Sequence, residues 1–158
     1  MGWMVRRFSD GDEQAVSALI ARTLREVNIR DYSQDYIEDT IRKMSPEDIL
    51  KRASWTHFYV VLDENIITGC GAVGPYWGRE DESSLFTIFV LPEYRGKGVG
   101  TRIMETLEAD EYFLRAGRVE IAASTTGCSF YQRFGYVCKN GVSAPDEEGL
   151  IRLEKHRK

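Results

Sequence analysis

A glycine-rich segment near the middle of the chain has the residue types and spacing of an anion-binding turn. Residues 95–101, Arg-Gly-Lys-Gly-Val-Gly-Thr, follow a strongly apolar stretch and open a segment with helical periodicity. The first backbone amides of a helix have no partner within it, and glycines let a pyrophosphate approach them closely. Arg95 and Lys97 add positive charge. The segment has neither the ending of an NTPase loop nor the glycine spacing of a dinucleotide-binding turn, so it predicts a site for another phosphorylated cofactor.

Three other patterns could carry chemistry, but their contexts are weaker. Residues 69–74 form a G-x-G-x-x-G, yet Pro75 follows where a helix would have to begin, so these glycines are interpreted as part of a strand or bulge. Cys128 and His57 could form a hydrolase dyad, but no third orienting residue or nucleophile elbow accompanies them. The three cysteines and two histidines lack paired ligand spacing, so no metal site is predicted.

The composition indicates one ordinary globular domain spanning residues 1–158, with 42% hydrophobic residues. A net charge of -4 and a pI near 5.3 give no broad basic field, so neither nucleic acid nor a membrane surface is an expected partner. The basic run 155–158 is interpreted as a solvated tail. No apolar run has the length of a membrane span, the first residues do not resemble a signal peptide, and the odd cysteine count suits a reducing compartment. A cytoplasmic location is therefore expected.

The elements that must position the glycine-rich turn alternate between strand and helix. In the first half the patterns predict a strand at 4–8, an amphipathic helix with Val16 to Val27 on its apolar face, helices at 34–44 and 46–51, and strands at 57–62 and 66–74. A loop is expected at 75–82. The strand at 84–91 is apolar on both faces, which places it in the middle of a sheet.

The second half continues the alternation. One helical face carries Val99, Ile103, Leu107 and Leu114, and it is followed by a strand at 119–123, a short helix at 128–134, and strands at 136–138 and 150–153. A strand, helix and strand in this order predict a parallel pair joined by a crossover. The fold class is therefore α/β or α+β.

Two segments of this chain resemble the motifs of one enzyme family. Residues 95–100, preceded by Val-Leu-Pro at 90–92, resemble the R/Q-x-x-G-x-G/A acetyl-coenzyme A signature of the GCN5-related N-acetyltransferases, and residues 130–136, Phe-Tyr-Gln-Arg-Phe-Gly-Tyr, resemble their FYxxxGF segment. The resemblance implies an acyl-CoA N-acyltransferase-like fold with acetyl-coenzyme A as cofactor. Such a fold has a mixed, twisted central sheet of about six to seven strands, about four flanking helices, and a splayed fourth and fifth strand.

The resemblance also assigns roles to particular residues. Backbone groups of Ile88, Phe89 and Val90 would pair with the pantetheine arm as an added strand does. The amides of Arg95, Gly96, Lys97, Gly98, Val99, Gly100 and Thr101 would hold the pyrophosphate. A neutral amine would attack the thioester directly, an amide near Phe89 or Val90 would stabilise the oxyanion, and Tyr131 would protonate the thiolate. Tyr131 has a second interpretation as a core aromatic.

The sequence departs from the family pattern at three positions. Ser124 stands where many members have an asparagine facing the pantetheine, and Gly127 stands where alanine is usual. The strand at 84–91 contains no carboxylate, whereas many relatives carry a glutamate there as general base. Glu82, acting through water, is the nearest candidate base, and Glu80 and Asp81 are weaker candidates. The alternative is that all three form a solvated acidic loop.

The acceptor is expected to be a small-molecule amine bound between the 25–55 region and the 140–149 loop. A protein amine is the alternative, as is a non-catalytic coenzyme-A-binding module that regulates a partner. The acidic runs 80–82 and 146–148 predict an acceptor with an additional positive charge. A homodimer is compatible with the resemblance, because many relatives pair through sheet edges or helices.

Overall fold

The computed structural model describes residues 3–157, which form a seven-stranded mixed sheet in the order β1-β2-β3-β4-β5-β7-β6. The strands are β1 (Trp3–Arg7), β2 (His57–Asp63), β3 (Ile66–Tyr76), β4 (Arg79–Val90), β5 (Arg118–Ser124), β6 (Val137–Cys138) and β7 (Leu150–His156). Six α-helices flank the sheet in this part of the chain: α1 (Glu13–Glu26), α2 (Gln34–Arg42), α3 (Pro46–Trp55), α4 (Val99–Glu108), α5 (Glu111–Leu114) and α6 (Cys128–Gln132). The mixed fold is confirmed, with two more helices than expected.

Local sequence signals explain where the helices of the first half begin. Ser45 caps α3 and Pro46 occupies its first turn. The hydroxyl of Ser45 accepts a hydrogen bond from the amide of Asp48, and the carboxylate of Asp48 accepts one from the amide of Ser45, so both bonds of a capping box are present. The hydroxyl of Ser33 caps α2 by accepting a hydrogen bond from the amide of Tyr36. Because no glycine or proline follows Lys51, α3 continues one turn beyond its predicted end.

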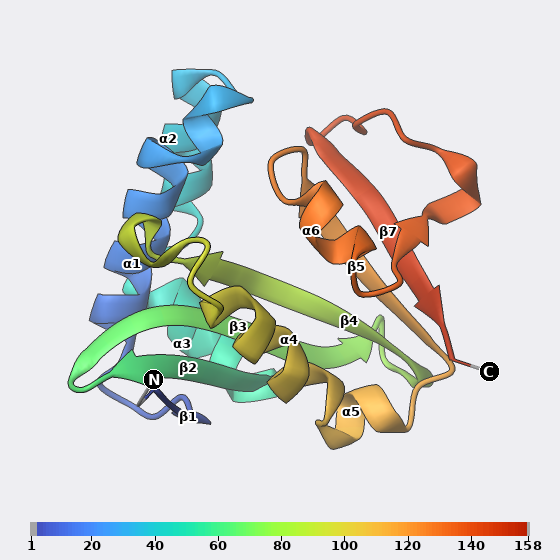
Figure 1. Ribbon diagram of the computed structural model, residues 1–158, viewed down its shortest axis with the longest axis horizontal. Coiled ribbons are helices and arrows are strands. Elements are labelled where there is room, and N and C mark those ends of the chain that lie inside the picture. Colours follow the sequence, from blue (N-terminus) through green and yellow to red (C-terminus); the bar gives the residue numbers. More distant parts are fainter. Residues whose placement is uncertain (1–2, 158) are drawn as a thin grey trace.

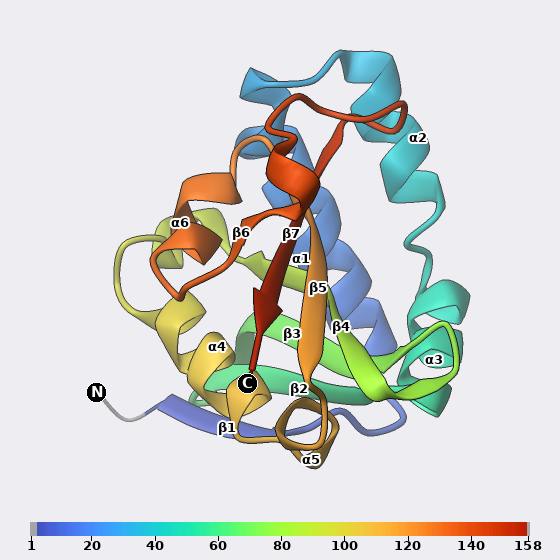
Figure 2. The same ribbon diagram turned by 90° about the vertical axis from the view of Figure 1, so that its right-hand side faces the viewer.

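The helices cover both faces of the sheet, and each face has its own hydrophobic core. Helices α1, α2 and α3 pack on one face, while α4 and α5 pack on the other (Figures 1 and 2). Gly69 and Gly71 of β3 lie beneath α4, where an added Cβ would come within 2.7 Å of Val99 and Ile103. These glycines are confirmed as strand residues, and their small size is what lets the helix approach the sheet.

Two segments differ from the sequence-based expectation. The expected loop at 75–82 is a hairpin that turns at Trp77 and Gly78, both with positive φ, so β4 begins at Arg79. The single helix expected from Val99 to Leu114 is broken, because Asp110 accepts a hydrogen bond from the Tyr112 amide and starts α5. Leu114 is 55% exposed and does not continue the apolar face of α4.

The sheet opens between β4 and β5. These two strands are parallel, as predicted, but they pair only from Glu82 to Leu85 on β4 and from Arg118 to Ile121 on β5. Beyond these residues they diverge, and Figure 1 shows β5 and β7 turning away from the rest of the sheet. The fourth position of β4 in the strand order confirms that it is a central strand. Within residues 3–157, no helix combines the length and the hydrophobicity of a membrane span.

Candidate active site

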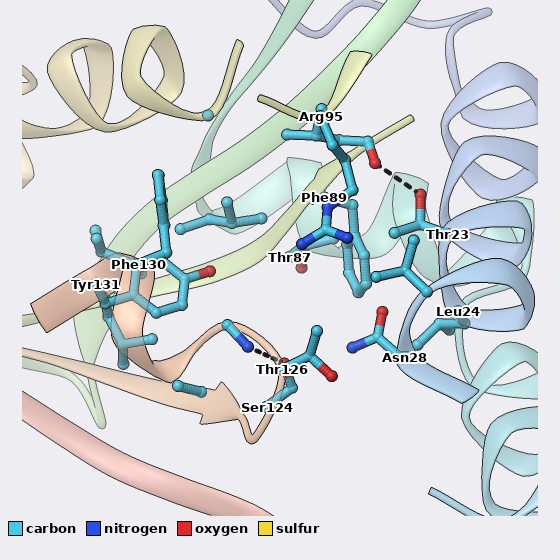
Figure 3. Close-up of a pocket in the computed structure, with 18 of the residues that line it drawn as sticks. Thr23, Leu24, Asn28, Thr87, Phe89, Arg95, Ser124, Thr126, Phe130 and Tyr131 are labelled. Carbon is cyan, nitrogen blue, oxygen red and sulfur yellow. Dashed lines mark hydrogen bonds between the residues drawn. The ribbon is translucent and has the colours of Figure 1, made fainter. Parts of the chain in front are cut away.

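A cleft of about 1200 Å³ lies where β4 and β5 separate. The ends of both strands, the turn before α4, and helix α6 form one side of it, and α1, α2 and α3 form the other. Figure 3 shows side chains from these elements converging on it. The cleft brings together most of the predicted site residues: Ile88, Phe89, Val90, Arg95, Gly96, Gly98, Gly100, Thr101, Ser124 and Tyr131. Glu82, Lys97 and Val99 do not line it.

A bulge in β4 shapes the middle of the cleft. Phe86 pairs with Ala72 and Phe89 pairs with Cys70, so Thr87 and Ile88 together oppose a single residue of β3. Thr87 has a φ of 56°, which is a strained conformation for a β-branched residue and costs about 1–3 kcal/mol. Two contacts hold it there: Arg52 donates to its hydroxyl at 2.7 Å, and the thiol of Cys70 donates to its carbonyl at 3.2 Å.

Beyond the bulge, the backbone of β4 turns polar groups toward the gap. The amide of Leu91 donates to the carbonyl of Thr68, so it faces β3. Backbone groups alternate along a strand, and the amide of Val90 therefore faces away from β3. The Val90 carbonyl lies 3.0 Å from the buried hydroxyl of Thr23 on α1. The unpaired edge of β4 is the surface on which an extended ligand can add as a strand.

The glycine-rich turn presents unpaired amides at one end of the cleft. The N-cap of α4, Gly98, has a φ of 97°, and the first intrahelical bond runs from the amide of Arg102 to its carbonyl at 3.0 Å. The amides of Val99, Gly100 and Thr101 therefore have no partner within the helix. They form an anion-binding helix start with the positive end of the helix dipole behind it. Gly100 contacts the ring of Phe130 on α6, where an added Cβ would lie 3.0 Å away.

The two cations of this turn lie in different surroundings. Arg95 lines the cleft, whereas Lys97 lies over the ring of Tyr94. We expect Arg95→Ala to weaken coenzyme A binding roughly tenfold, because one charge-assisted hydrogen bond to a phosphate is lost at an exposed position. Calorimetric titration of both alanine variants measures this. Lys97→Ala is the matched control, and an equal loss in the two variants would contradict a specific role for Arg95.

Tyr131 of α6 faces the cleft from beside β5. Its side chain is 8% exposed, and Figure 3 shows the hydroxyl directed into the cleft. Burial raises the pKa of this phenol, with a smaller contribution from Cys70. The group is therefore a neutral hydrogen-bond donor at physiological pH. Both aromatics, Phe130 and Tyr131, line the cleft and pack with the core, but only Tyr131 brings a hydroxyl to the cleft.

Ser124 closes the end of β5. Its hydroxyl oxygen accepts a hydrogen bond from the amide of Gly127 at 3.1 Å, which orients the turn into α6 (Figure 3). The hydroxyl proton remains available to a ligand in the cleft. Ser124 can thus supply one donor where an asparagine would offer two.

The position of Glu82 does not suit a catalytic base. It lies in the paired part of β4 and accepts a hydrogen bond from Arg118 at 3.2 Å. Phe89 lies seven positions after Glu82, which at about 3.3 Å per residue amounts to about 23 Å of strand. Arg79 binds Asp81 at the exposed hairpin end. The acidic run 80–82 therefore lies outside the cleft, where Glu82 cannot reach an acceptor amine as a base.

The second acidic run does not face the cleft either. The side chains of Asp146 and Glu148 pair with Arg152 at 3.1 and 3.4 Å. Backbone carbonyls of this loop instead receive hydrogen bonds at 2.6 Å from the hydroxyls of Tyr32 and Tyr36. Neither acidic run lines the cleft, so the prediction that these carboxylates attract a cationic acceptor is not supported.

The stacked rings of Tyr32 and Tyr36 join three segments around the cleft. Tyr32 also accepts a hydrogen bond from the amide of Thr125, and Thr126 donates to Asp31 at 2.5 Å. Figure 2 shows the segment before β7 reaching across to α2. These bonds tie the turn after β5 and the loop before β7 to the helical side of the cleft.

Several cleft residues carried no recognisable sequence signal. Arg52, Thr87, Asn28 and Thr23 all line the cleft. Thr23 and Asn28 interrupt the apolar face of α1 and its continuation, and a polar residue on such a face was the one available hint. The possible dyad of Cys128 and His57 does not form, because the imidazole of His57 binds the buried Asp110 at 2.9 Å instead.

The family model described as an acetyltransferase (GNAT) domain matches residues 54–138. The structure is similar to the PaiA N-acetyltransferase of Thermoplasma acidophilum in complex with coenzyme A, with a TM-score of 0.81, 20% identity and 99% of each chain covered. It is also similar to a GCN5-related N-acetyltransferase of Rhodopseudomonas palustris, with a TM-score of 0.78, 18% identity and coverage of 97% and 94%.

A third similar structure is N-acetylglutamate synthase from Neisseria gonorrhoeae complexed with coenzyme A and L-arginine. The TM-score is 0.64 at 18% identity, and the match covers 98% of this chain and 33% of that one. A search of curated proteins gives no match. The family model covers more than half of the sequence, including the glycine-rich turn and the Tyr131 segment. The chain belongs to the GNAT family of acetyltransferases.

Proposed function

We propose that this N-acetyltransferase acetylates the amine of a small metabolite and that it does so by direct transfer in the cleft between β4 and β5. The observation that carries the proposal is the end of β4–β5 pairing at Leu85 and Ile121, which leaves a channel from the phosphate-binding turn to the helical side. The tyrosine-linked loop beside α2 narrows that side, which favours a small acceptor over a protein surface. We also propose that the enzyme consists of a single domain and acts in the cytoplasm.

The residues present fit acetyl-coenzyme A. The unpaired amides of Val99, Gly100 and Thr101 would hold the pyrophosphate with Arg95, and the free edge of β4 would pair with the pantetheine amides. When bound, the cofactor supplies an activated acetyl thioester. The chain's own contribution is to hold the acceptor amine in line with that group, which by positioning alone can supply much of the rate.

Two groups of the chain would stabilise the developing negative charge and transfer a proton. The amide of Val90, directed toward the gap, would donate a hydrogen bond to the carbonyl oxygen as negative charge develops on it. The Tyr131 hydroxyl would donate its proton to the departing sulfur. A water molecule would remove the proton of the acceptor amine, because the residues lining the cleft in the described chain include no carboxylate and no histidine.

The pH dependence follows from that lining. We expect kcat/KM to rise with pH up to the pKa of the acceptor's own amine, because only the neutral amine can attack. Burial raises the pKa of Tyr131, so the acid stays protonated well into the alkaline range and no loss from its ionisation should occur below about pH 10. Profiles with two acceptors of different basicity measure this. An inflexion at the same pH for both acceptors would instead indicate a titrating base on the enzyme.

The proposed function is tested by measuring coenzyme A release against a panel of small amines and lysine-containing peptides. We expect turnover with small amines and little with peptides. Binding of acetyl-coenzyme A without turnover of any acceptor would contradict it and favour a regulatory, cofactor-binding role. A Gly98→Val variant, which should not bind the cofactor, is the blank for nonenzymatic transfer.

A further inference from the structure

The charged side chains that line the cleft are all arginines. Arg52, Arg95 and Arg133 line it, and no aspartate or glutamate does within residues 3–157. Arg95 lies in the phosphate-binding turn, and Arg133 lies over the ring of Phe130, which contacts Gly100 of the same turn. Those two therefore lie near the site of the cofactor phosphates. Arg52 comes from α3 on the opposite face of the sheet, so the phosphates do not account for it.

Arg52 makes no direct ion pair in the described chain, although the charge of the nearby Asp48 acts on it. Its guanidinium donates to the hydroxyl of Thr87 at 2.7 Å and lies 5.3 Å from the ring centre of Phe86, but no carboxylate lies within 4 Å. Asp48, one turn earlier on α3, is bound to the hydroxyl of Ser45 in the capping box. Burial lowers the pKa of Arg52. Because arginine stays charged at physiological pH, a half-buried guanidinium of this kind favours an anion beside it.

A second unpaired group faces the same cleft. Asn28 is 8% exposed, and its side-chain amide makes no hydrogen bond within residues 3–157. Figure 3 shows this amide pointing into the cleft. No buried side-chain nitrogen or oxygen in the described chain lacks a hydrogen-bond partner, so the polar atoms of Asn28 are open to the cleft and available to a polar ligand.

The position of Arg52 places this charge beside the reacting group. Thr87, its hydrogen-bond partner, belongs to the bulge and precedes the residues whose backbone would hold the thioester. After the bond from Nη1 to Thr87, the guanidinium retains N–H groups for the paired, parallel bonds that arginine makes with a carboxylate. One guanidinium matches the single charge of a carboxylate more closely than the double charge of a phosphate.

We propose that the acceptor is an amine that also carries a carboxylate, and that Arg52 binds this carboxylate with Asn28 as a neighbouring polar contact. This inference rests on the proposed function, because it names the acceptor class of the same site. An acceptor with a carboxylate is the opposite of the additional positive charge that the acidic runs 80–82 and 146–148 predict for the acceptor.

The first test uses matched acceptors with the unmodified protein. Each set contains an amino acid, its amide and the corresponding decarboxylated amine, over several side chains. We expect kcat/KM for the amino acid to exceed that for its amide roughly ten- to a hundredfold, the ratio that one charge-assisted pair supplies. The amide's amine is less basic, so intrinsic amine reactivity works against this preference. If amides or decarboxylated amines are acetylated as well or better, the inference is wrong while the proposed function stands.

The second test asks whether Arg52 causes the preference. Arg52→Gln should remove most of the difference between amino acid and amide, because kcat/KM should fall far more for the amino acid than for the amide. Lys51→Gln removes a charge from the exposed side of the same helix and is the matched control. An equal loss on both acceptors in Arg52→Gln would mean that Arg52 only supports the bulge, which overturns the inference.

The remaining outcomes also decide the matter. If Arg52→Gln does not fold, Asn28→Ala takes its place. The inference then predicts that Asn28→Ala lowers the ratio of kcat/KM for the amino acid to kcat/KM for its amide, relative to the unmodified protein. An unchanged ratio would count against the inference. A stronger preference for aminoalkyl phosphates than for amino acids would overturn the carboxylate assignment. If the protein binds acetyl-coenzyme A but no small amine is turned over, the proposed function itself fails.

Discussion

Replacing Gly98 with valine should abolish measurable binding of coenzyme A. Gly98 caps α4 with a φ of 97°, a conformation that β-branched residues rarely adopt, and its backbone forms part of the surface that a pyrophosphate must approach. Loss of two charge-assisted hydrogen bonds, at about 1.5–3 kcal/mol each, corresponds to a decrease in affinity of a hundredfold or more. Isothermal titration of the variant with acetyl-coenzyme A measures the effect.

Gly11→Val is the control for backbone strain. Gly11 has a φ of 108° and open space around the position of a Cβ, but it lies before α1 and does not line the cleft. Both variants should lose a similar amount of thermal stability, and only the Gly98 variant should lose the cofactor. Unchanged affinity in Gly98→Val would remove the turn from the cofactor site. Gly100 is a less suitable position, because a side chain there would first displace Phe130.

Replacing Tyr131 with phenylalanine should lower kcat about a hundredfold with little change in cofactor affinity. The ring packing is kept while the hydroxyl directed into the cleft is lost. General acid catalysis contributes about 10²–10⁴-fold, and the lower end is expected because a thiol with a pKa near 8.5 gives a tolerable leaving group. Since the proton is needed only as the carbon–sulfur bond breaks, kcat and kcat/KM should fall together. Steady-state kinetics on the best acceptor from the panel measures both.

Tyr136→Phe separates loss of the acid from loss of a buried hydroxyl. Tyr136 is also buried, but its hydroxyl donates to Glu108 at 2.9 Å and the residue does not line the cleft. This variant should change stability and leave kcat near the original value. A Tyr131→Phe enzyme with near-original kcat would return Tyr131 to the core-packing interpretation.

The sequence was most informative where one short segment contains all the residues that a structural feature requires. The turn at 95–101 contains its own glycines, charges and helix start, so its position after a central strand was predictable from the residues alone. The crossover between β4 and β5 was predictable for the same reason, since strand, helix and strand follow one another along the chain. The choice of Gly69 and Gly71 as strand residues also needed only their immediate neighbours.

Features formed by distant segments were not predictable in this way. Arg52 and Thr87 are 35 positions apart and meet only because α3 packs against the bulge in β4. A strand that began at Ser84 would place Glu82 in the loop beside the site. Once β4 begins at Arg79, its parallel register pairs Glu82 with Arg118 at the closed end of the sheet. Along a strand, each residue advances the chain by about 3.3 Å, so a residue that is near a motif in sequence can be far from it in space.

The interrupted β4–β5 ladder also links the fold to the supply of its cofactor. Beyond Leu85 and Ile121, the two halves of the sheet share no backbone pairing, and a bound pantetheine arm would provide the missing partners. A ligand that binds only the folded state stabilises it by about 2.7 kcal/mol at a hundred times its Kd. The resistance of this protein to unfolding and to proteolysis in a cell should therefore rise and fall with the local acetyl-coenzyme A pool, so that metabolic state sets the protein's lifetime as well as its turnover.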